Sequence, residues 1–264
     1  MSEQARQNKP ENPYFEVQAE LGITKHAGGL AATKKLISLC QLDREKLILD
    51  VGCGAGISTV NLVRRSECQV IGIDLRLRMI ERAAERLQDR GLTDKVMLVQ
   101  ADAQKLPFRS SVFDAVLSES VTAFVTEKKT ALSEYTRVVK QGGYIALNEI
   151  TWLEPPDRGM EDYVSKALGG IMPLSAEGWE DLLTAASLRI VQATSQRLTL
   201  TDQFLNEMRA IGICDYFKAV IRFFSMFTKP YFRTAIREML GQACSLPRRL
   251  THYLGWGIYL GKRE

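Results

Sequence analysis

The chain contains few of the residues that cross-link small folds or bind structural metals. Its 264 residues include five cysteines and two histidines, and no two cysteines form a CxxC pair. We therefore expect neither a disulfide framework nor a metal site. Apolar burial has to hold the fold together instead, and 45% hydrophobic residues are ample for one large domain.

Long apolar runs are also absent from the sequence. No stretch reaches the roughly 18 to 20 apolar residues that a membrane-spanning helix needs. The first residues, MSEQARQNKPENP, are polar and lack the apolar segment of a signal peptide. The sequence does not determine the oligomeric state, and a dimer is one possibility. These features lead us to expect a cytoplasmic protein without a transmembrane segment.

Positive charge is concentrated in the last quarter of the chain. Residues 201–264 contain ten Lys and Arg against five Asp and Glu, whereas the whole chain has a net charge of +4. Basic residues interleaved with aromatic ones suit a nucleic acid, the surface of a membrane or an anionic small molecule. They are equally typical of a solvated helix face, so the charge alone does not choose a partner.

From about residue 46, short apolar runs alternate with amphipathic stretches. Apolar residues recur every three to four positions along 76–91, which predicts a helix that ends at a glycine. Alternating strands and helices predict parallel pairing, and continuous apolar strands predict a sheet buried on both faces. The expected strands are 46–51, 69–74, 95–100, 112–118 and 144–150.

The regular alternation ends near residue 151. We expect a loop with a short helix, then a helix capped by Ser175, a strand at 189–200, a mostly helical insert at 201–252 and a final strand at 255–263. The predicted fold is α/β, a Rossmann-like doubly wound sheet of seven mostly parallel strands. Its last strand is antiparallel, and the helical insert forms a cap.

Polar residues fall at the carboxyl ends of the expected strands, where ligands bind in such a sheet. We expect one crevice to be lined by Asp50, Asp74, Asp102, Ser118 and Asn148.

The first strand turns into a helix through three glycines. In LILDVGCGAGIST, residues 47–59, these are Gly52, Gly54 and Gly56. A dinucleotide fingerprint, GxGxxG, would need its third glycine at position 57 or 59, and these positions hold Ile57 and Thr59. The loop is therefore expected to approach a ligand other than a pyrophosphate.

The glycine loop and the strand-end acids resemble those of class I S-adenosylmethionine-dependent methyltransferases (type 11-like) over roughly residues 25–150. This resemblance implies that S-adenosylmethionine is the cofactor and S-adenosylhomocysteine the product. It implies that Asp50 and the loop hold the amino-acid end, that Asp74 takes both ribose hydroxyls, and that Asp102 accepts from the adenine amino group. A diol suits a bidentate acceptor. The implied cofactor-binding residues are His26, Gly28, Asp50, Gly52, Cys53, Gly54, Gly56, Asp74, Leu75, Met79, Asp102, Ala103 and Glu119.

A second, local resemblance precedes the loop. HAGGLAATKKLISLC, residues 26–40, is similar to the N-terminal helix of phosphoethanolamine and related small-molecule N-methyltransferases, and GWGIYLGKR to their last strand. It places His26 beside the cofactor and Tyr14 in a segment that could close over it. After the fourth strand those enzymes carry an aspartate and a histidine, where this chain has Ser120 and Phe124. Their acceptor chemistry is therefore not carried over.

Methyl transfer is an in-line displacement that depends on orientation and on the exclusion of water. A general base is needed only when the nucleophile arrives protonated. The catalytic candidates are His26, Tyr14 and Glu149, and the substrate-binding candidates are Asn148, Ser120 and Phe124. Strand-end hydrogen bonding is the structural alternative for Asn148 and Glu149, and packing or cofactor contact is the alternative for His26.

We therefore predict an S-adenosylmethionine-dependent methyltransferase that acts on a small molecule. The expected parts are a lid and helix (1–42), a cofactor-binding core (43–150) and the C-terminal part of the same fold (151–264). The insert, with Arg222, Lys229 and Arg233 beside aromatic residues, is expected to roof the acceptor pocket and to favour an anionic or aromatic acceptor. One alternative is a lipid or isoprenoid methyltransferase at a membrane surface. An RNA-modifying enzyme is another, although no nucleic-acid methyltransferase motif is found.

Overall fold

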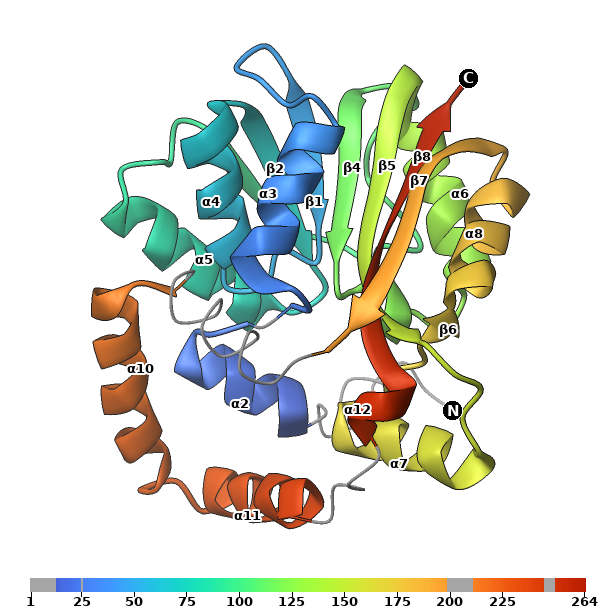
Figure 1. Cartoon of the computed structure of the whole chain (residues 1–264). Coiled ribbons are helices and arrows are strands. Elements are labelled where there is room, and N and C mark those ends of the chain that lie inside the picture. Colours follow the sequence, from blue (N-terminus) through green and yellow to red (C-terminus); the bar gives the residue numbers. More distant parts are fainter. Residues whose placement is uncertain (1–12, 25, 199–210, 245–249) are drawn as a thin grey trace, which may run out of the picture.

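The computed structural model describes residues 13–24, 26–198, 211–244 and 250–264, and it shows a layered α/β fold (Figure 1). A central sheet separates two layers of helices, and a third group of helices lies beyond the carboxyl ends of the strands. One face of the sheet is covered by α3 (Gly29–Leu39), α4 (Ile57–Ser66) and α5 (Leu77–Asp89), and the other by α6 (Lys128–Val138) and α8 (Ala176–Ala185).

Seven strands form the main path of the sheet, in the order β3-β2-β1-β4-β5-β8-β7. Neighbours on this path are parallel except at β8, which is antiparallel to both β5 and β7. The predicted doubly wound, Rossmann-like sheet with an antiparallel last strand is confirmed. The strands are β1 (Leu47–Val51), β2 (Gln69–Asp74), β3 (Val96–Gln100), β4 (Phe113–Glu119), β5 (Val139–Trp152), β7 (Leu188–Arg197) and β8 (Leu254–Arg263).

The prediction of seven strands was one short. The sheet has eight, because β6 (Leu174–Ser175) pairs with β5 outside the main path. Two residues are too few to give the alternation from which a strand is predicted. The helix after β6 does begin as expected, since the Ser175 hydroxyl accepts a hydrogen bond from the Gly178 backbone N–H at 3.1 Å.

Two buried clusters, one on each face of the sheet, follow from the alternation of side chains along the strands. On β1, Ile48 packs on the face covered by α3 and α4, where it meets Leu36 and Leu62. The next residue, Leu49, belongs to the opposite cluster with Leu132 of α6. The sheet is therefore buried on both sides, as its apolar strands predict.

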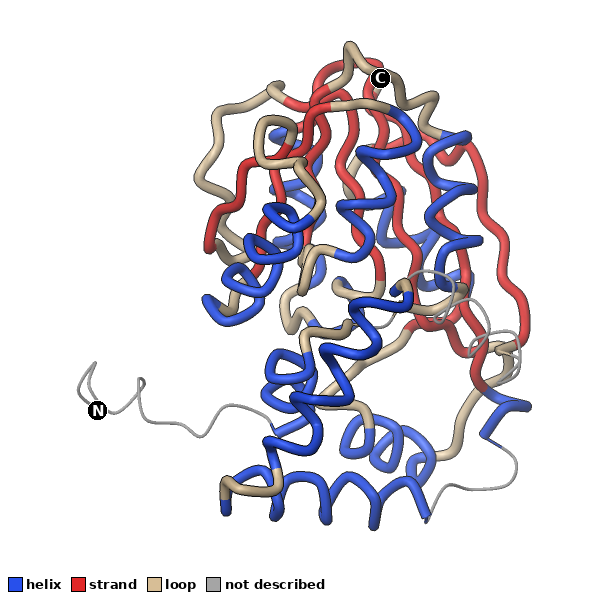
Figure 2. Tube along the Cα trace, turned by 90° about the vertical axis from the view of Figure 1, so that its left-hand side faces the viewer, coloured by secondary structure: helices blue, strands red, loops and turns tan. Residues whose placement is uncertain are grey.

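The third group of helices gathers beyond the carboxyl ends of the strands (Figure 2). It consists of α2 (Pro13–Leu21), α7 (Arg158–Ala167), α10 (Ile213–Met226), α11 (Pro230–Cys244) and α12 (Leu250–Tyr253). The described part of the insert is thus helical, and the break falls between Met226 and Pro230. Within the described ranges, no helix has the length and the apolar character needed to cross a membrane.

The insert packs against α2 rather than against the sheet. Val17 of α2 forms a small apolar cluster with Met226 of α10 and with Phe232, Ala235 and Ile236 of α11. In Figure 1, α2 lies between α11 and the carboxyl ends of the strands. The N-terminal helix α2 is therefore the element through which the insert approaches the site.

Candidate active site

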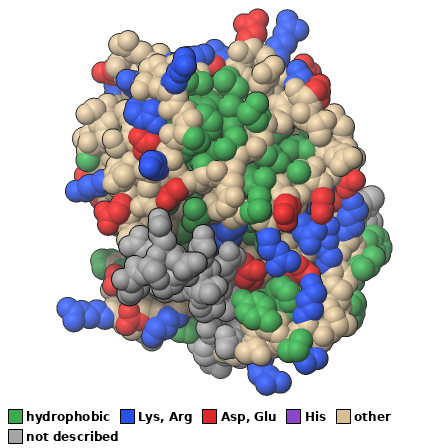
Figure 3. Space-filling view, turned by 180° about the vertical axis from the view of Figure 1, so that it is seen from behind, with side chains coloured by type: hydrophobic (Ala, Val, Ile, Leu, Met, Phe, Trp, Pro, Cys, Tyr) green, Lys and Arg blue, Asp and Glu red, His purple; other side chains and the backbone are tan. Residues whose placement is uncertain are grey.

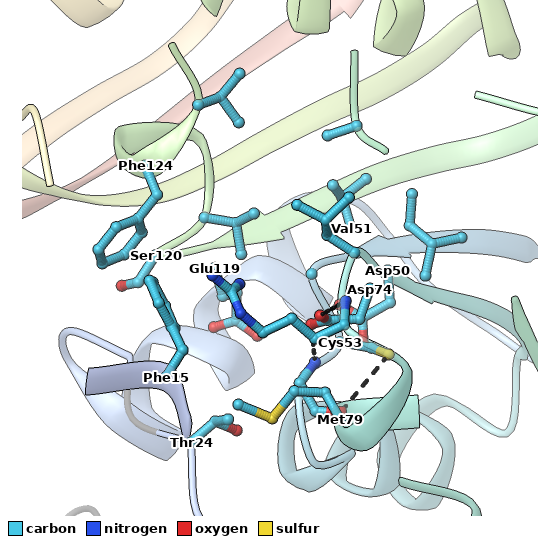
Figure 4. Close-up of a pocket in the computed structure, with 18 of the residues that line it drawn as sticks. Phe15, Thr24, Asp50, Val51, Cys53, Asp74, Met79, Glu119, Ser120 and Phe124 are labelled. Atoms are coloured by element: carbon cyan, nitrogen blue, oxygen red, sulfur yellow. Dashed lines mark hydrogen bonds between the residues drawn. The ribbon is translucent and has the colours of Figure 1, made fainter. Parts of the chain in front are cut away.

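A cavity of about 380 Å³ lies at the carboxyl ends of β1, β2 and β4, next to α2. Figure 4 shows Asp50 and Asp74 on one side of it and Phe15 and Phe124 on the other. Most of the residues predicted from the sequence line this cavity: Tyr14, His26, Asp50, Gly52, Cys53, Gly54, Asp74, Leu75, Met79, Asp102, Ala103, Glu119, Ser120 and Phe124.

The glycine loop has a backbone that only glycine adopts without strain. Gly52 and Gly54 have φ angles of 65° and 53°, in the left-handed region. A Cβ atom on Gly52 would clash with the side chain of Val121, and one on Gly54 would lie 2.7 Å from Thr24 Cγ2. The loop therefore approaches both the segment after β4 and the segment after α2 closely.

The acids at the ends of β1 and β2 are held by groups of the same loop region. Asp74 accepts hydrogen bonds from the Gly54 N–H at 3.0 Å and from the Arg76 N–H at 2.9 Å, and burial raises its pKa. Asp50 is fully buried and accepts from the Thr59 hydroxyl at 2.6 Å. Burial raises the pKa of Asp50 to about 7.

The third strand-end acid, Asp102, follows β3 and also lines the cavity. Asp102 accepts a hydrogen bond from the Gln104 backbone N–H at 2.8 Å, which fixes the turn after β3. Asp102, Ala103 and Gln104 all line the cavity, together with Leu75 after β2. The predicted acids of β1, β2 and β3 are thus brought to one cavity from three successive strands.

A buried polar cluster joins the start of α3 to the end of β4. The Glu119 carboxylate lies 3.2 Å from His26 Nδ1 and accepts hydrogen bonds from the Thr33 hydroxyl at 3.1 and 3.0 Å. Asn148 Nδ2 donates to the Ala27 carbonyl at 2.7 Å and lies 3.4 Å from the same carboxylate. Burial raises the pKa of Glu119 to about 7.

Two predicted site residues on β5 do not line the cavity. We expected Asn148 and Glu149 at the end of a strand, but β5 continues to Trp152 and both residues pair with β8 in its interior. Both are fully buried. Ser118, on β4, is also fully buried and outside the cavity lining, where its hydroxyl donates to the Glu149 carboxylate at 3.1 Å.

Glu149 instead holds the turn that follows β4. Its carboxylate accepts hydrogen bonds from the backbone N–H groups of Val121, Thr122 and Ala123 at 3.2, 2.8 and 3.2 Å. These residues enter or form the 3-10 turn Thr122–Phe124. Glu149 therefore stabilises the turn that carries Phe124, and its carboxylate does not face the cavity.

Gly28 and Gly56 also lie outside the cavity lining. Each is the residue before a helix, Gly28 before α3 and Gly56 before α4. They were predicted to bind the cofactor because they belong to the same motifs as residues that line the cavity. In the structure they adjoin the cavity lining without being part of it.

An aromatic wall forms the other end of the cavity. The rings of Tyr14 and Phe15 meet edge to face at 5.2 Å between centroids, and those of Phe15 and Phe124 at 5.1 Å. The Arg76 guanidinium lies 3.8 Å from the centroid of the Phe15 ring. Gly169, from the loop after α7, completes this end.

Sequence reasoning missed several residues of this wall. Phe15, Arg76 and Gly169 were not predicted, although all three line the cavity. Phe15 directly follows Tyr14, and Arg76 directly follows Leu75. Both could have been predicted from the sequence as neighbours of residues that were expected at the site. Gly169 carries no such signal, because only tertiary packing brings the loop after α7 to the cavity.

Four arginines recur at every fourth position along α5 and at the residue that caps its end, and we call them the arginine ladder: Arg78, Arg82, Arg86 and Arg90. Residues at this spacing share one helix face. Arg78 pairs with Glu16 at 3.2 Å and with Glu20 at 2.7 Å, and Arg82 Nε donates to the Ala19 carbonyl at 3.1 Å. The first two arginines therefore anchor α2.

The last two arginines of the ladder connect three segments. Arg86 donates to the Ala55 carbonyl in the glycine loop and to the Gly22 carbonyl, at 2.9 Å, after α2. Arg86 and Arg90 also pair with the buried Asp215 of α10, at 3.2 and 2.8 Å. One face of α5 thus ties the cofactor loop, the lid and the insert together.

The basic residues of the insert take part in the same network. Lys229 pairs with Glu20 at 2.7 Å, and Arg222 pairs with Glu85 at 3.0 Å. Burial alone would raise the pKa of Glu20, but the hydrogen bond from Lys229 and the charges of Lys229, Arg78 and Arg82 lower it. Among the residues of 211–244 whose side chains the structure describes, none lines the cavity. The described part of the insert lies behind α2, and these two cations pair with acids of α5 and α2.

Comparisons with known proteins agree with this geometry. A family model described as a methyltransferase domain matches residues 49–147. An uncharacterized protein of Haemophilus influenzae is 30% identical over 186 residues, which cover 69% of this chain and 74% of that protein. Phosphoethanolamine N-methyltransferase 3 of Arabidopsis thaliana is 26% identical over 239 residues, 90% of this chain but 46% of that enzyme.

A solved structure covers nearly the whole chain. The S-adenosylmethionine-dependent methyltransferase from Geobacter sulfurreducens in complex with S-adenosyl-L-homocysteine superposes with a TM-score of 0.71 at 17% identity, over 97% of this chain and 100% of that one. At this identity the likeness concerns the fold. Taken with the family match and the sequence relatives, it shows that the chain belongs to the class I S-adenosylmethionine-dependent methyltransferases and is an enzyme of that kind, with S-adenosylmethionine as methyl donor.

Proposed function

We propose that the enzyme methylates a small-molecule acceptor held between the cofactor end of the cavity and α2. The observation that carries this proposal is the aromatic wall of Tyr14, Phe15 and Phe124, which lines the same cavity as Asp50 and Asp74. An apolar wall with a few polar groups nearby is typical of small-molecule sites. In this proposal residues 1–42 supply the lid, 43–150 hold the cofactor, and 151–264 complete the acceptor end and support the lid.

The residues at the cofactor end suit S-adenosylmethionine. We assign the ribose diol to Asp74, whose carboxylate lies at the glycine loop, and the adenine amino group to Asp102. Leu75, Met79 and Ala103 supply apolar contacts for the adenosine. When bound, the cofactor supplies a methyl group on a positively charged sulfur, and the buried carboxylates of Asp50 and Glu119 favour that charge.

The charge of the cavity favours an acceptor that is neutral or cationic. Four acids line it, Asp50, Asp74, Asp102 and Glu119, whereas Arg76 is the one Lys or Arg among its described lining residues. Arg76 already lies over the Phe15 ring. Aromatic faces attract cations and flat rings. We therefore replace the earlier expectation of an anionic acceptor with that of an uncharged or amine-bearing one.

His26 is the group that we assign to proton removal when the acceptor arrives protonated. Glu119 lies 3.2 Å from Nδ1 of the imidazole, and a proton held there makes Nε2 the basic nitrogen. Glu119 would thereby orient the ring, as a carboxylate does for other catalytic histidines. Glu149 is not proposed as a base, because its carboxylate is held by three backbone N–H groups away from the cavity.

The test uses isotopically labelled methyl donor with three separate cell fractions: aqueous small molecules, organic-soluble lipids and total RNA. We expect label in a compound of low mass, and we expect Asp74→Ala to weaken cofactor binding by roughly 1.5 to 3 kcal/mol. His26→Gln should lower the turnover of a protonated acceptor by about 10²-fold or more while leaving cofactor affinity unchanged. Label in RNA alone would contradict the proposal, and label in membrane lipids alone would move the acceptor to that class.

A further inference from the structure

The insert helix α10 is built with its apolar side outward. Its inner face carries Asp215, which is buried and paired with Arg86 and Arg90, and Arg222, which pairs with Glu85. The usual surface helix places charge outside and apolar residues inside. The inner face of α10 also carries the buried apolar residues Ala219 and Met226, so ion pairs and apolar contacts dock the helix together. Its large aromatic and aliphatic side chains are left on the outer side.

The outer face of α10 presents large apolar side chains to solvent. Phe217, Ile221 and Phe224 lie one helical turn apart and are 62%, 70% and 67% exposed. The flanks of this face add Tyr216, Phe223 and Phe227, and Phe223 and Phe227 meet edge to face at 5.1 Å. We call these six residues the outer apolar face. Contiguous exposed apolar surface of this kind marks an interaction site.

Basic side chains surround the outer apolar face. Between positions 213 and 237 the chain has five Lys and Arg and one acid, the buried Asp215. Lys218, Lys229, Arg233 and Arg237 are exposed on α10, on α11 and at the turn between them. Lys218 pairs with Asp89 and Lys229 with Glu20, whereas Arg233 and Arg237 have no ion pair among the described residues. Seen from behind, the flank formed by α10 shows apolar side chains next to a group of Lys and Arg (Figure 3). The helix that carries this face, α10, lies at the outer edge of the molecule (Figure 1).

We propose that α10 and the start of α11 dock the enzyme on a lipid surface that carries negative charge. The outer apolar face would enter the boundary between headgroups and acyl chains, and Arg233 and Arg237 would contact the anionic headgroups. Aromatic and aliphatic residues on one side of a helix with basic residues beside them are the pattern of an interfacial helix. A helix at the outer edge of the molecule can reach a flat, deformable surface.

The charge pattern argues against a second copy of the chain as the occupant. In a symmetric dimer the same patch faces itself, so Arg233 and Arg237 would meet the same cations of the partner. Like charges brought together at an interface oppose association. An anionic lipid surface complements both the apolar and the basic part of this region.

The proposal is tested by co-sedimentation of the full-length enzyme with vesicles of equimolar phosphatidylcholine and phosphatidylglycerol, and with vesicles of phosphatidylcholine alone. The expected result is binding to the anionic vesicles that weakens as salt is added. The triple variant Phe217→Ser, Ile221→Ser, Phe224→Ser should lower this binding by at least about tenfold. Arg233→Gln and Arg237→Gln should each lower it by about fivefold, on the anionic vesicles only.

A matched control exists on the two edge strands of the sheet. Met97 on β3 and Val191 on β7 are also exposed and apolar, so Met97→Ser with Val191→Ser removes apolar surface elsewhere and should leave vesicle binding unchanged. Equal affinity of all variants for S-adenosylhomocysteine shows that the fold is intact. The proposal is overturned if the wild-type enzyme does not bind anionic vesicles at low salt, or if the triple variant binds them as the wild type does. It is also overturned if sedimentation velocity shows a wild-type dimer that the triple variant abolishes without any vesicle binding.

Discussion

The two ends of the cavity are held in place by different forces. The cofactor end consists of turns that follow directly from buried parallel strands, and its contacts are short in sequence, as in the hydrogen bond between Gly54 and Asp74, 20 residues apart. The acceptor end depends on α2, which ion pairs anchor across 58 residues to Arg78 and across 209 residues to Lys229. The cofactor end is held in place by the buried strands that carry it. The position of α2 at the acceptor end depends on the strength of these ion pairs.

The residues that bind the methyl donor are therefore held differently from the residues that we propose to select and enclose the acceptor. Burial of apolar strands responds little to salt, whereas partly exposed ion pairs weaken with it. Changes at the cofactor end should therefore abolish binding of the donor, and changes at the acceptor end should loosen the lid while the donor still binds. Three predictions probe the two ends in turn.

The largest effect is expected at the glycine loop. Gly52→Ala combines a left-handed φ with a clash against Val121, so the loop has to move. Gly142→Ala meets the same conformational cost, about 1–2 kcal/mol, at a position where a Cβ meets nothing within 4 Å. Calorimetric titration with S-adenosylhomocysteine should show roughly hundredfold weaker binding for the first variant and wild-type binding for the second. Equal losses in both would mean that strain alone, not the position of the loop, limits binding.

A smaller effect is expected at the anchor of the lid. Glu20 receives Arg78 and Lys229, so Glu20→Gln should speed hydrogen exchange in α2 by about tenfold to hundredfold, equivalent to roughly 1.5 to 3 kcal/mol. Cofactor affinity should change little. The control is Glu85→Gln, which also removes two arginine contacts but at a half-exposed carboxylate, where at most about 1 kcal/mol is expected. Unchanged exchange in the Glu20 variant would assign the docking of α2 to its apolar contacts with the insert.

The smallest effect concerns pH. The pKa values of Asp50 and Glu119 are raised to about 7 by burial, so both carboxyls lose their protons as the pH rises through neutrality. The positive sulfur of S-adenosylmethionine gains from this ionisation, whereas the neutral sulfur of S-adenosylhomocysteine does not. The preference for the donor over the product should therefore rise, by up to about tenfold, between roughly pH 6 and pH 8.

Two carboxyls with similar pKa values allow a control for this pH effect. Glu119→Gln should flatten the rise, because Glu119 lines the cavity. Glu149→Gln should not, although burial also raises the pKa of Glu149 to about 7, because its carboxylate lies behind the turn that carries Phe124. A preference that stays constant with pH in the wild-type enzyme would show that neither buried carboxylate senses the sulfur.

The comparison of the cofactor end with the acceptor end also explains which parts of the fold and of the site could be predicted from the sequence. Apolar runs and glycine turns are local signals, so the strands and the loop from Gly52 to Gly56 were predicted close to their observed positions. Asn148 and Glu149 were misplaced because the end of β5 is set by pairing with β8, more than 100 residues later. The arginine ladder is visible as a spacing of four, but its partners Glu20 and Asp215 are found only through tertiary packing. The first ten residues of the predicted helical insert, 201–210, lie outside the described residues.

The position of β8 in the sheet has a consequence for how such an enzyme changes over evolution. Arg197 near the end of β7 and Gly255 near the start of β8 are partners in neighbouring strands, so the chain leaves the sheet for the insert and returns at adjacent points. The whole insert is therefore, topologically, the loop of one hairpin. Closing a longer loop costs only about 0.6 kcal/mol for each doubling of its length. Helices that support the lid and contact the surroundings can thus be lengthened, shortened or exchanged without moving a strand that carries the cofactor site.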